Sequence, residues 1–177
     1  MFIDLLRKRR SIRVFQDKEV EKEKIDLLME AMLRAPSSRS LNPWEFVVVQ
    51  NRETINALSK AKPHGSAFMK NAKLAIVICA DPEKCDVWIE DCSIASLLLH
   101  LQATDLDLGS CWVQIRLREH NEHMSAEEYV ADILGLKEGM VVEAIIAIGY
   151  PAKESTGHPE SSLLKDRVSF ERYGEKG

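Results

Sequence analysis

The stretch from residue 86 to residue 104 constrains the fold more than any other part of the chain. It has helical spacing, but its apolar residues do not gather on one face. They lie around much of the circumference: Trp88, Ile89, Cys92, Ala95, Leu98, Leu99 and Leu101. Such a helix must be covered from several directions. We therefore expect it to be long, central and largely buried.

The remaining elements are predicted from shorter patterns. Apolar, β-branched runs predict strands over 45–50, 74–80, 111–115 and 141–148, the first of them covered on both faces. Helical spacing predicts helices over 2–8, 22–34, 52–61 and 125–134, the last with a capping box formed by Ser125 and Glu128. Strands and helices do not alternate cleanly, and no GxGxxG motif follows the first strand, so the fold class is α+β rather than Rossmann.

Length and segment composition indicate one domain, residues 1–177, followed over its last part by a tail. A chain of 177 residues has the size of a single domain. The tail, 152–177, is polar and has little core of its own, so we expect it to order against another surface such as a second subunit. The longest apolar runs are too short to span a bilayer, and no signal peptide is recognisable. We expect a cytoplasmic protein without membrane partners.

Charge is distributed unevenly. Residues 1–15 hold five basic groups and one acid, a net of +4, whereas the whole chain has a net charge of −4, so the remainder carries −8. A cationic segment on an acidic protein favours a local anion site. A nucleic-acid-binding protein would usually be basic overall, so no nucleic-acid partner is expected.

The cysteines and histidines do not form a recognisable metal site. Cys79, Cys85, Cys92 and Cys111 contain no CxxC pair, which favours reduced thiols over a disulfide framework. His120 and His123 lack further ligands at metal-binding spacing. No metal is expected.

Three polar segments carry the candidate chemistry. The first, Arg9–Arg13, places guanidiniums and a hydroxyl where an extended chain would point residues 9, 11 and 13 the same way. This indicates either a phosphate cradle or a solvated run of charge. The second, Pro36–Trp44, is a polar loop suited to gripping a heterocycle or simply to turning the chain. The third, Gly109–Arg116, is a buried strand whose Gln114 and Arg116 need polar partners.

Taken in order, these segments resemble the FMN-dependent nitroreductase family over residues 5–174. Further matches are Leu134-Gly135-Leu136, Ala147 to Pro151 and Phe170 to Tyr173. The resemblance implies a homodimer of α+β subunits around a mostly antiparallel sheet of four to five strands. It also implies a long buried helix, flanking helices, and FMN in a cleft at the subunit interface contacted by both chains.

The resemblance also implies where FMN binds. Arg9 and Ser11 would hold the phosphate with Arg10 nearby, and Arg13 would lie beside the flavin N1/C2 carbonyl. Ser37, Ser38 and Arg39 would reach the flavin from the partner subunit, with Asn42 near the position of the family's amide contact. Val113, Gln114 and Ile115 would lie by the flavin ring near N5, and Arg167 or Lys165 of the tail would return to the phosphate.

The implied activity transfers a hydride from NADH or NADPH through flavin N5 to an electron-poor acceptor, such as a nitroaromatic or a quinone, by a ping-pong scheme. His64 is a candidate to face the substrate. The protein's own catalytic contribution would be placement and electrostatics, because no acid–base dyad is visible. Two alternatives stay open. One is reductive dehalogenation or flavin fragmentation on the same scaffold, and the other is a non-enzymatic protein that binds partners through its basic arm.

Overall fold

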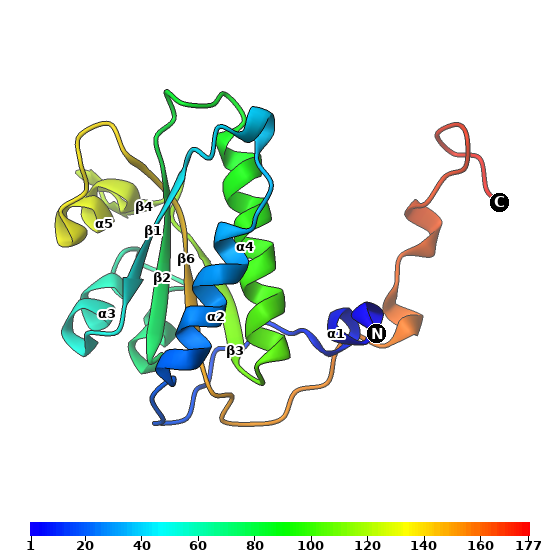
Figure 1. Cartoon of the computed structure of the whole chain (residues 1–177), viewed down its shortest axis with the longest axis horizontal. Coiled ribbons are helices and arrows are strands. Elements are labelled where there is room, and N and C mark those ends of the chain that lie inside the picture. The colour runs from blue at the N-terminus through cyan, green and yellow to red at the C-terminus, as the bar shows by residue number, and fades with distance from the viewer.

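The computed structural model describes residues 1–177 and is built around one antiparallel sheet (Figure 1). Its strand order is β1-β2-β6-β3, with every neighbouring pair antiparallel. The strands are β1 (Trp44–Val49), β2 (Leu74–Ala80), β3 (Gly109–Gln114) and β6 (Val141–Gly149). The predicted α+β class and the mostly antiparallel sheet are confirmed.

One face of the sheet is covered by α4 (Trp88–Asp105) and α2 (Lys22–Leu33), which Figure 1 shows side by side. The expectation of a long central helix holds, because α4 packs on α2, on the sheet and on α1 (Phe2–Lys8). Its sheet-facing side chains join one apolar cluster with those of α2, β2 and β6, including Leu28, Met32, Ile76, Cys92, Leu99 and Ile146. Ile94 and Leu97 remain exposed on the opposite side of α4.

The other face is covered by α3 (Arg52–Leu58), the 3₁₀ turn η2 (Ala67–Asn71) and α5 (Ala126–Leu134). Ser125 caps α5 with the predicted capping box, and Gly135 ends the helix in the left-handed conformation, with φ of 63°. A small hairpin, β4 (Glu119–Asn121) with β5 (Met124–Ser125), was not predicted from the sequence. Its strands are too short and too polar to give a strand pattern.

The prediction that strand 45–50 is covered on both faces is confirmed only in part, because apolar side chains pack on both faces but most of them are only half-buried. Within β1 only Val49 is buried, and Glu45 is exposed. The reason is topological, because β1 is an outer strand of the sheet. An apolar run alone does not distinguish an edge strand from a central one.

β6 contains an irregularity that matters for the site. Ile78 pairs with Ala144 and Cys79 pairs with Val142, so Glu143 has no counterpart on β2. This extra residue is a β-bulge, which locally changes the direction in which a side chain points. The Glu143 side chain consequently meets Ser93 of α4.

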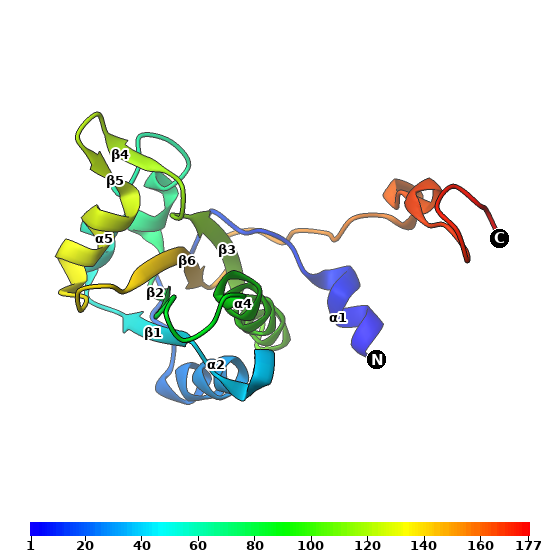
Figure 2. The ribbon, with the colours of Figure 1, turned by 90° about the horizontal axis from the view of Figure 1, so that it is seen from above.

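Both ends of the chain leave the body of the fold. α1 and the segment after Pro151 project to the same side in Figures 1 and 2, and the tail extends past α1 as a strap with two single turns, η3 (Glu160–Ser162) and η4 (Lys165–Arg167). Gly157 passes so close to the Arg7 carbonyl that a side chain there would collide with it. None of the helices has the length and hydrophobicity that crossing a lipid bilayer requires.

Candidate functional site

The segment from Arg9 to Gln16, here called the arm, is fixed along the outer edge of β3 and the end of β6. The Ile12 amide donates to the Ser110 carbonyl at 2.9 Å, and Ser11 forms a parallel bridge with Ser110. Further along, the Gln16 amide donates to the Tyr150 carbonyl at 2.8 Å. Figure 2 shows the arm running from α1 past β3. These bonds hold the arm extended, so its side chains alternate between two sides.

The two sides of the arm have different surroundings. Arg9 and Arg13 both act electrostatically on the buried Cys111 thiol of β3. Arg10 and Ile12 instead line a hollow of about 730 Å³ between the arm, the end of α4 and the start of the tail. There the Arg10 guanidinium contacts the His158 ring. Arg10 therefore lies on the side of the arm away from Arg9.

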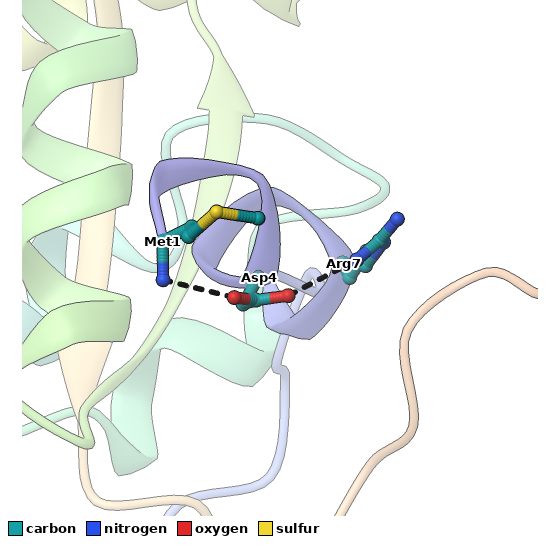
Figure 3. Close-up of polar contacts among 3 residues, drawn as sticks. All are labelled: Met1, Asp4 and Arg7. Carbon is teal, nitrogen blue, oxygen red and sulfur yellow. Dashed lines mark hydrogen bonds and ion pairs between the residues drawn. The ribbon is translucent and has the colours of Figure 1, made fainter.

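Ion pairing separates the basic groups of the N-terminal segment into two sets. Arg7 pairs with Asp4, which also accepts from the N-terminal ammonium at 2.9 Å (Figure 3), and these hydrogen bonds lower the pKa of Asp4. Lys8 pairs with Asp107. Arg9 and Arg13 have no carboxylate within 4.0 Å. Their charge is therefore available to an anionic ligand.

Sequence reasoning missed two cations that extend this cluster, Lys62 and Arg118. Lys62 also acts on Cys111, and burial together with the Arg118 charge lowers the pKa of Lys62. Neither has an acidic partner among the ion pairs. Arg13, a third member of this group, lies over the Phe68 ring, with its guanidinium carbon 5.9 Å from the ring centre. No local motif marks Lys62 or Arg118, because the fold alone brings them to the arm.

His100 of α4 contacts the strand residue, Ser110, to which the arm is bonded. Its Nδ1 lies 2.7 Å from the Ser110 hydroxyl, next to the carbonyl that holds Ile12. Burial, and secondarily the Arg9 charge, lower the pKa of His100 to about 4. The ring is therefore neutral at pH 7 and adds no charge beneath the cationic side of the arm.

The outer edge of β3 offers main-chain groups beside these cations. Val113 and Ile115 point their side chains into the core, so only their main chain can reach a ligand. The Ile115 amide donates inward to the Glu143 carbonyl, and alternation along the strand turns the Gln114 amide outward. The Gln114 side chain is occupied, because it accepts from the Trp112 indole at 2.9 Å and donates to the Arg116 carbonyl at 3.0 Å.

The polar loop Ser37–Asn42 is held by its own hydrogen bonds near the other end of α4. Ser37 and Asn42 bond each other, and Arg39, Ser40 and Asn42 adopt positive φ angles. Buried Asp91 accepts the Ser38 amide at 2.9 Å, and Asp86 pairs with Arg39. Asp91 and His100 are nine residues apart on one helix, roughly 13 Å along its axis. The loop and the arm of one chain therefore lie near opposite ends of α4.

The remaining predicted residues make no hydrogen bond or ion pair with the cation cluster. His64 is exposed and makes no hydrogen bond, although it follows Lys62 by two residues. Lys165 pairs with Glu160 within the tail. Arg167 is exposed on the projecting tail, and its side chain makes neither an ion pair nor a hydrogen bond.

Comparison with known proteins adds independent findings. Residues 6–64 and 60–150 match the nitroreductase family. The structure resembles an FMN-dependent nitroreductase from Clostridium difficile R20291 with a TM-score of 0.95 and 47% identity, covering 97% of this chain and 99% of that one. An Archaeoglobus fulgidus protein provisionally named NADH dehydrogenase/NAD(P)H nitroreductase is 36% identical, over 93% of this chain and 94% of its own. An NADH dehydrogenase of Thermus thermophilus is 29% identical, over 91% of each chain.

Proposed function

Because the chain belongs to the nitroreductase family of oxidoreductases, we propose that it binds FMN and transfers reducing equivalents from NADH or NADPH to an electron-poor acceptor such as a nitroaromatic or a quinone. The observation that carries this proposal is the group of cations without acidic partners around Cys111, namely Arg9, Arg13 and Lys62, beside the part of the outer β3 edge that the arm leaves unpaired. A phosphorylated, planar cofactor needs both features.

The residues present fit FMN at both ends. Arg9 and Ser11 would bind the phosphate, since guanidinium and hydroxyl donors match phosphate oxygens. Arg13 and Lys62 would face the pyrimidine side of the ring and stabilise negative charge there. The outward amide of Gln114 would orient the ring. When bound, FMN supplies the hydride chemistry at N5, and the chain supplies position and charge.

The proposal includes a homodimer. The loop Ser37–Asn42 lies near the far end of α4 from the arm, so it is better placed to contact the ligand of a second subunit than its own. The exposed Ile94 and Leu97 of α4 offer an apolar surface for such a partner. The tail, with Arg167 exposed on it, would pack on that partner and bring a further cation to a phosphate.

The first test is the absorbance spectrum of the purified protein, before and after incubation with FMN and desalting. Retained flavin bands, bleached by NADH or NADPH and restored by a quinone, are the expected result. A colourless protein after incubation would overturn the proposal and favour a basic arm that binds other partners. Oxygen-dependent loss of the chromophore would indicate flavin fragmentation instead.

Gly109→Ala should weaken FMN binding without touching a ligand-binding side chain. A Cβ at position 109 would lie 2.7 Å from the Ile12 Cβ, so the arm must move outward. Overpacking of this kind costs about 1–3 kcal/mol. We expect FMN affinity, measured by fluorescence quenching, to fall about tenfold or more.

A compensating variant separates the arm from general instability. Ile12→Gly removes all three atoms that the new Cβ would meet, including the Ile12 Cβ. The loss of FMN affinity in Gly109→Ala combined with Ile12→Gly should therefore be smaller than the sum of the losses in the two single variants. Strict additivity would mean that the close approach does not position the arm.

A further inference from the structure

Glu143 is a buried carboxyl group that the proposed function does not use. Only 2% of the residue is exposed. Its Oε1 accepts the Ser93 hydroxyl at 2.7 Å, whereas its Oε2 is buried without any hydrogen-bond partner. Buried polar atoms almost always form a hydrogen bond, so a carboxylate oxygen without one in a central strand needs an explanation.

No cation neutralises this carboxyl. Arg116 and Glu90 are the charged groups that act on it, with opposite signs, and no ion pair within 4.0 Å joins Glu143 to any base. The Arg116 guanidinium is instead directed over the Trp88 ring, 5.7 Å from its centre. The remaining titratable neighbour on α4 is Cys92, whose own pKa is raised mainly by burial and also by Glu143. Burial raises the pKa of Glu143 to about 7.

The main chain of Glu143 connects it to the candidate site. Its carbonyl accepts the amides of Ile115 at 3.1 Å and of Arg116 at 2.9 Å. Glu143 is therefore bonded to the end of β3 from its β6 side. The proposed function assigns the flavin ring to the opposite, outer side of the same strand end. The β-bulge makes this arrangement possible, because the carbonyl holds β3 while the side chain turns toward α4.

We propose that Glu143 is a positioning residue that binds a proton when the flavin in front of it is reduced, and releases that proton when the flavin is reoxidised. This inference rests on the proposed function. Hydride transfer to oxidised FMN adds two electrons and one proton and leaves negative charge on the ring. That charge disfavours an ionised carboxyl nearby, so the Glu143 carboxylate takes a proton from solvent to become neutral. The carboxyl gains and loses only a proton, and both electrons stay with the flavin.

The test is the number of protons taken up when FMN-loaded protein is reduced chemically, read with a pH indicator in weakly buffered solution. Near pH 7.5 the wild type should take up more protons per flavin than Glu143→Gln, by up to about three quarters of a proton, the fraction of Glu143 that is ionised before reduction. Well below pH 7 the difference should vanish, because Glu143 is then protonated in both redox states. The pH dependence of the flavin midpoint potential should show the same difference in slope.

Two further variants make the result decisive. Glu45→Gln removes an exposed carboxylate from the outer strand β1 and should leave the proton count unchanged. Ser93→Ala removes the hydrogen bond that favours ionised Glu143, so the extra uptake should move to higher pH. This second variant also answers the question if Glu143→Gln does not fold.

The outcomes separate the two proposals. Failure of the protein to bind FMN would overturn the proposed function. FMN binding with the same proton count in wild type and Glu143→Gln, at every pH, would overturn the role of Glu143 alone.

Discussion

Arg9→Ala combined with Ser11→Ala should yield protein that purifies without FMN. The two residues supply a guanidinium and a hydroxyl on the cationic side of the arm, and Arg9 has no carboxylate partner to lose. Hydrogen bonds to charged groups contribute about 1.5–3 kcal/mol each. Removing both should lower FMN affinity by a factor on the order of a hundred or more, since about 1.4 kcal/mol corresponds to tenfold.

Two controls, one with a different ligand and one with a different variant, show whether this loss of affinity depends on the phosphate. Riboflavin lacks the phosphate, so its affinity should be nearly equal in wild type and double variant. Arg10→Ala removes the same charge from the other side of the arm, where Arg10 contacts His158. It should change FMN affinity by no more than about twofold, as for an ordinary surface substitution. An Arg10→Ala effect as large as that of the double variant would mean that the arm does not discriminate between its two sides.

His100 sets the pH range for these measurements. Its pKa is lowered to about 4, so the folded protein loses stability as pH falls from the ordinary histidine value toward 4, where the buried ring must gain a proton. Affinities are therefore best compared about one pH unit or more above 6.5, where the ring is almost entirely neutral in both folded and unfolded chains. A phosphate paired with Arg9 would offset the positive charge that Arg9 places near the His100 ring, and would therefore reduce the part of the pKa lowering that Arg9 causes.

Periodicity was sufficient to predict the longer helices and the four strands of the sheet, whereas the antiparallel arrangement was an implication of the family resemblance. The longer elements were found because strand and helix periods differ over many residues, and the Ser125–Glu128 box and Gly135 fixed the ends of α5. The hairpin from Glu119 to Ser125 was missed because its short polar strands have no period. The exposure of β1 was missed because strand order, which places β1 at an edge, is set by pairing across distant segments.

The candidate site could be proposed from the sequence only where its residues lie close together in the chain. The arm could be read from the sequence because Arg9, Ser11 and Arg13 alternate within five residues. Lys62, Arg118 and Glu143 could not, because their roles depend on contacts across the fold. Glu143 is the clearest example. It lies in an otherwise apolar strand, and only the pairing of Ile78 with Ala144 and of Cys79 with Val142 reveals the bulge that turns it toward Ser93.

Removal of residues 159–177 should convert the proposed dimer to a folded monomer. Beyond His158, the side-chain hydrogen bonds and ion pairs of the tail are made within the tail itself. Its apolar side chains, Leu163, Leu164, Val168, Phe170 and Tyr173, are each more than half exposed. A subunit that loses only this strap keeps its core, so its thermal unfolding should stay cooperative and its circular dichroism nearly unchanged.

The proposed dimer, in contrast, should lose both apolar contact and the cation that Arg167 would bring to the phosphate. Sedimentation velocity should show monomer at concentrations where the full chain is dimeric, and FMN affinity should fall with it. Leu163→Ser with Leu164→Ser in the full-length chain is the matched control, because it keeps Arg167 and every charge while removing apolar surface. That variant should dimerise more weakly than wild type. A truncated protein that remains dimeric and binds FMN fully would place the interface on α4 alone and leave the tail without a role in the site.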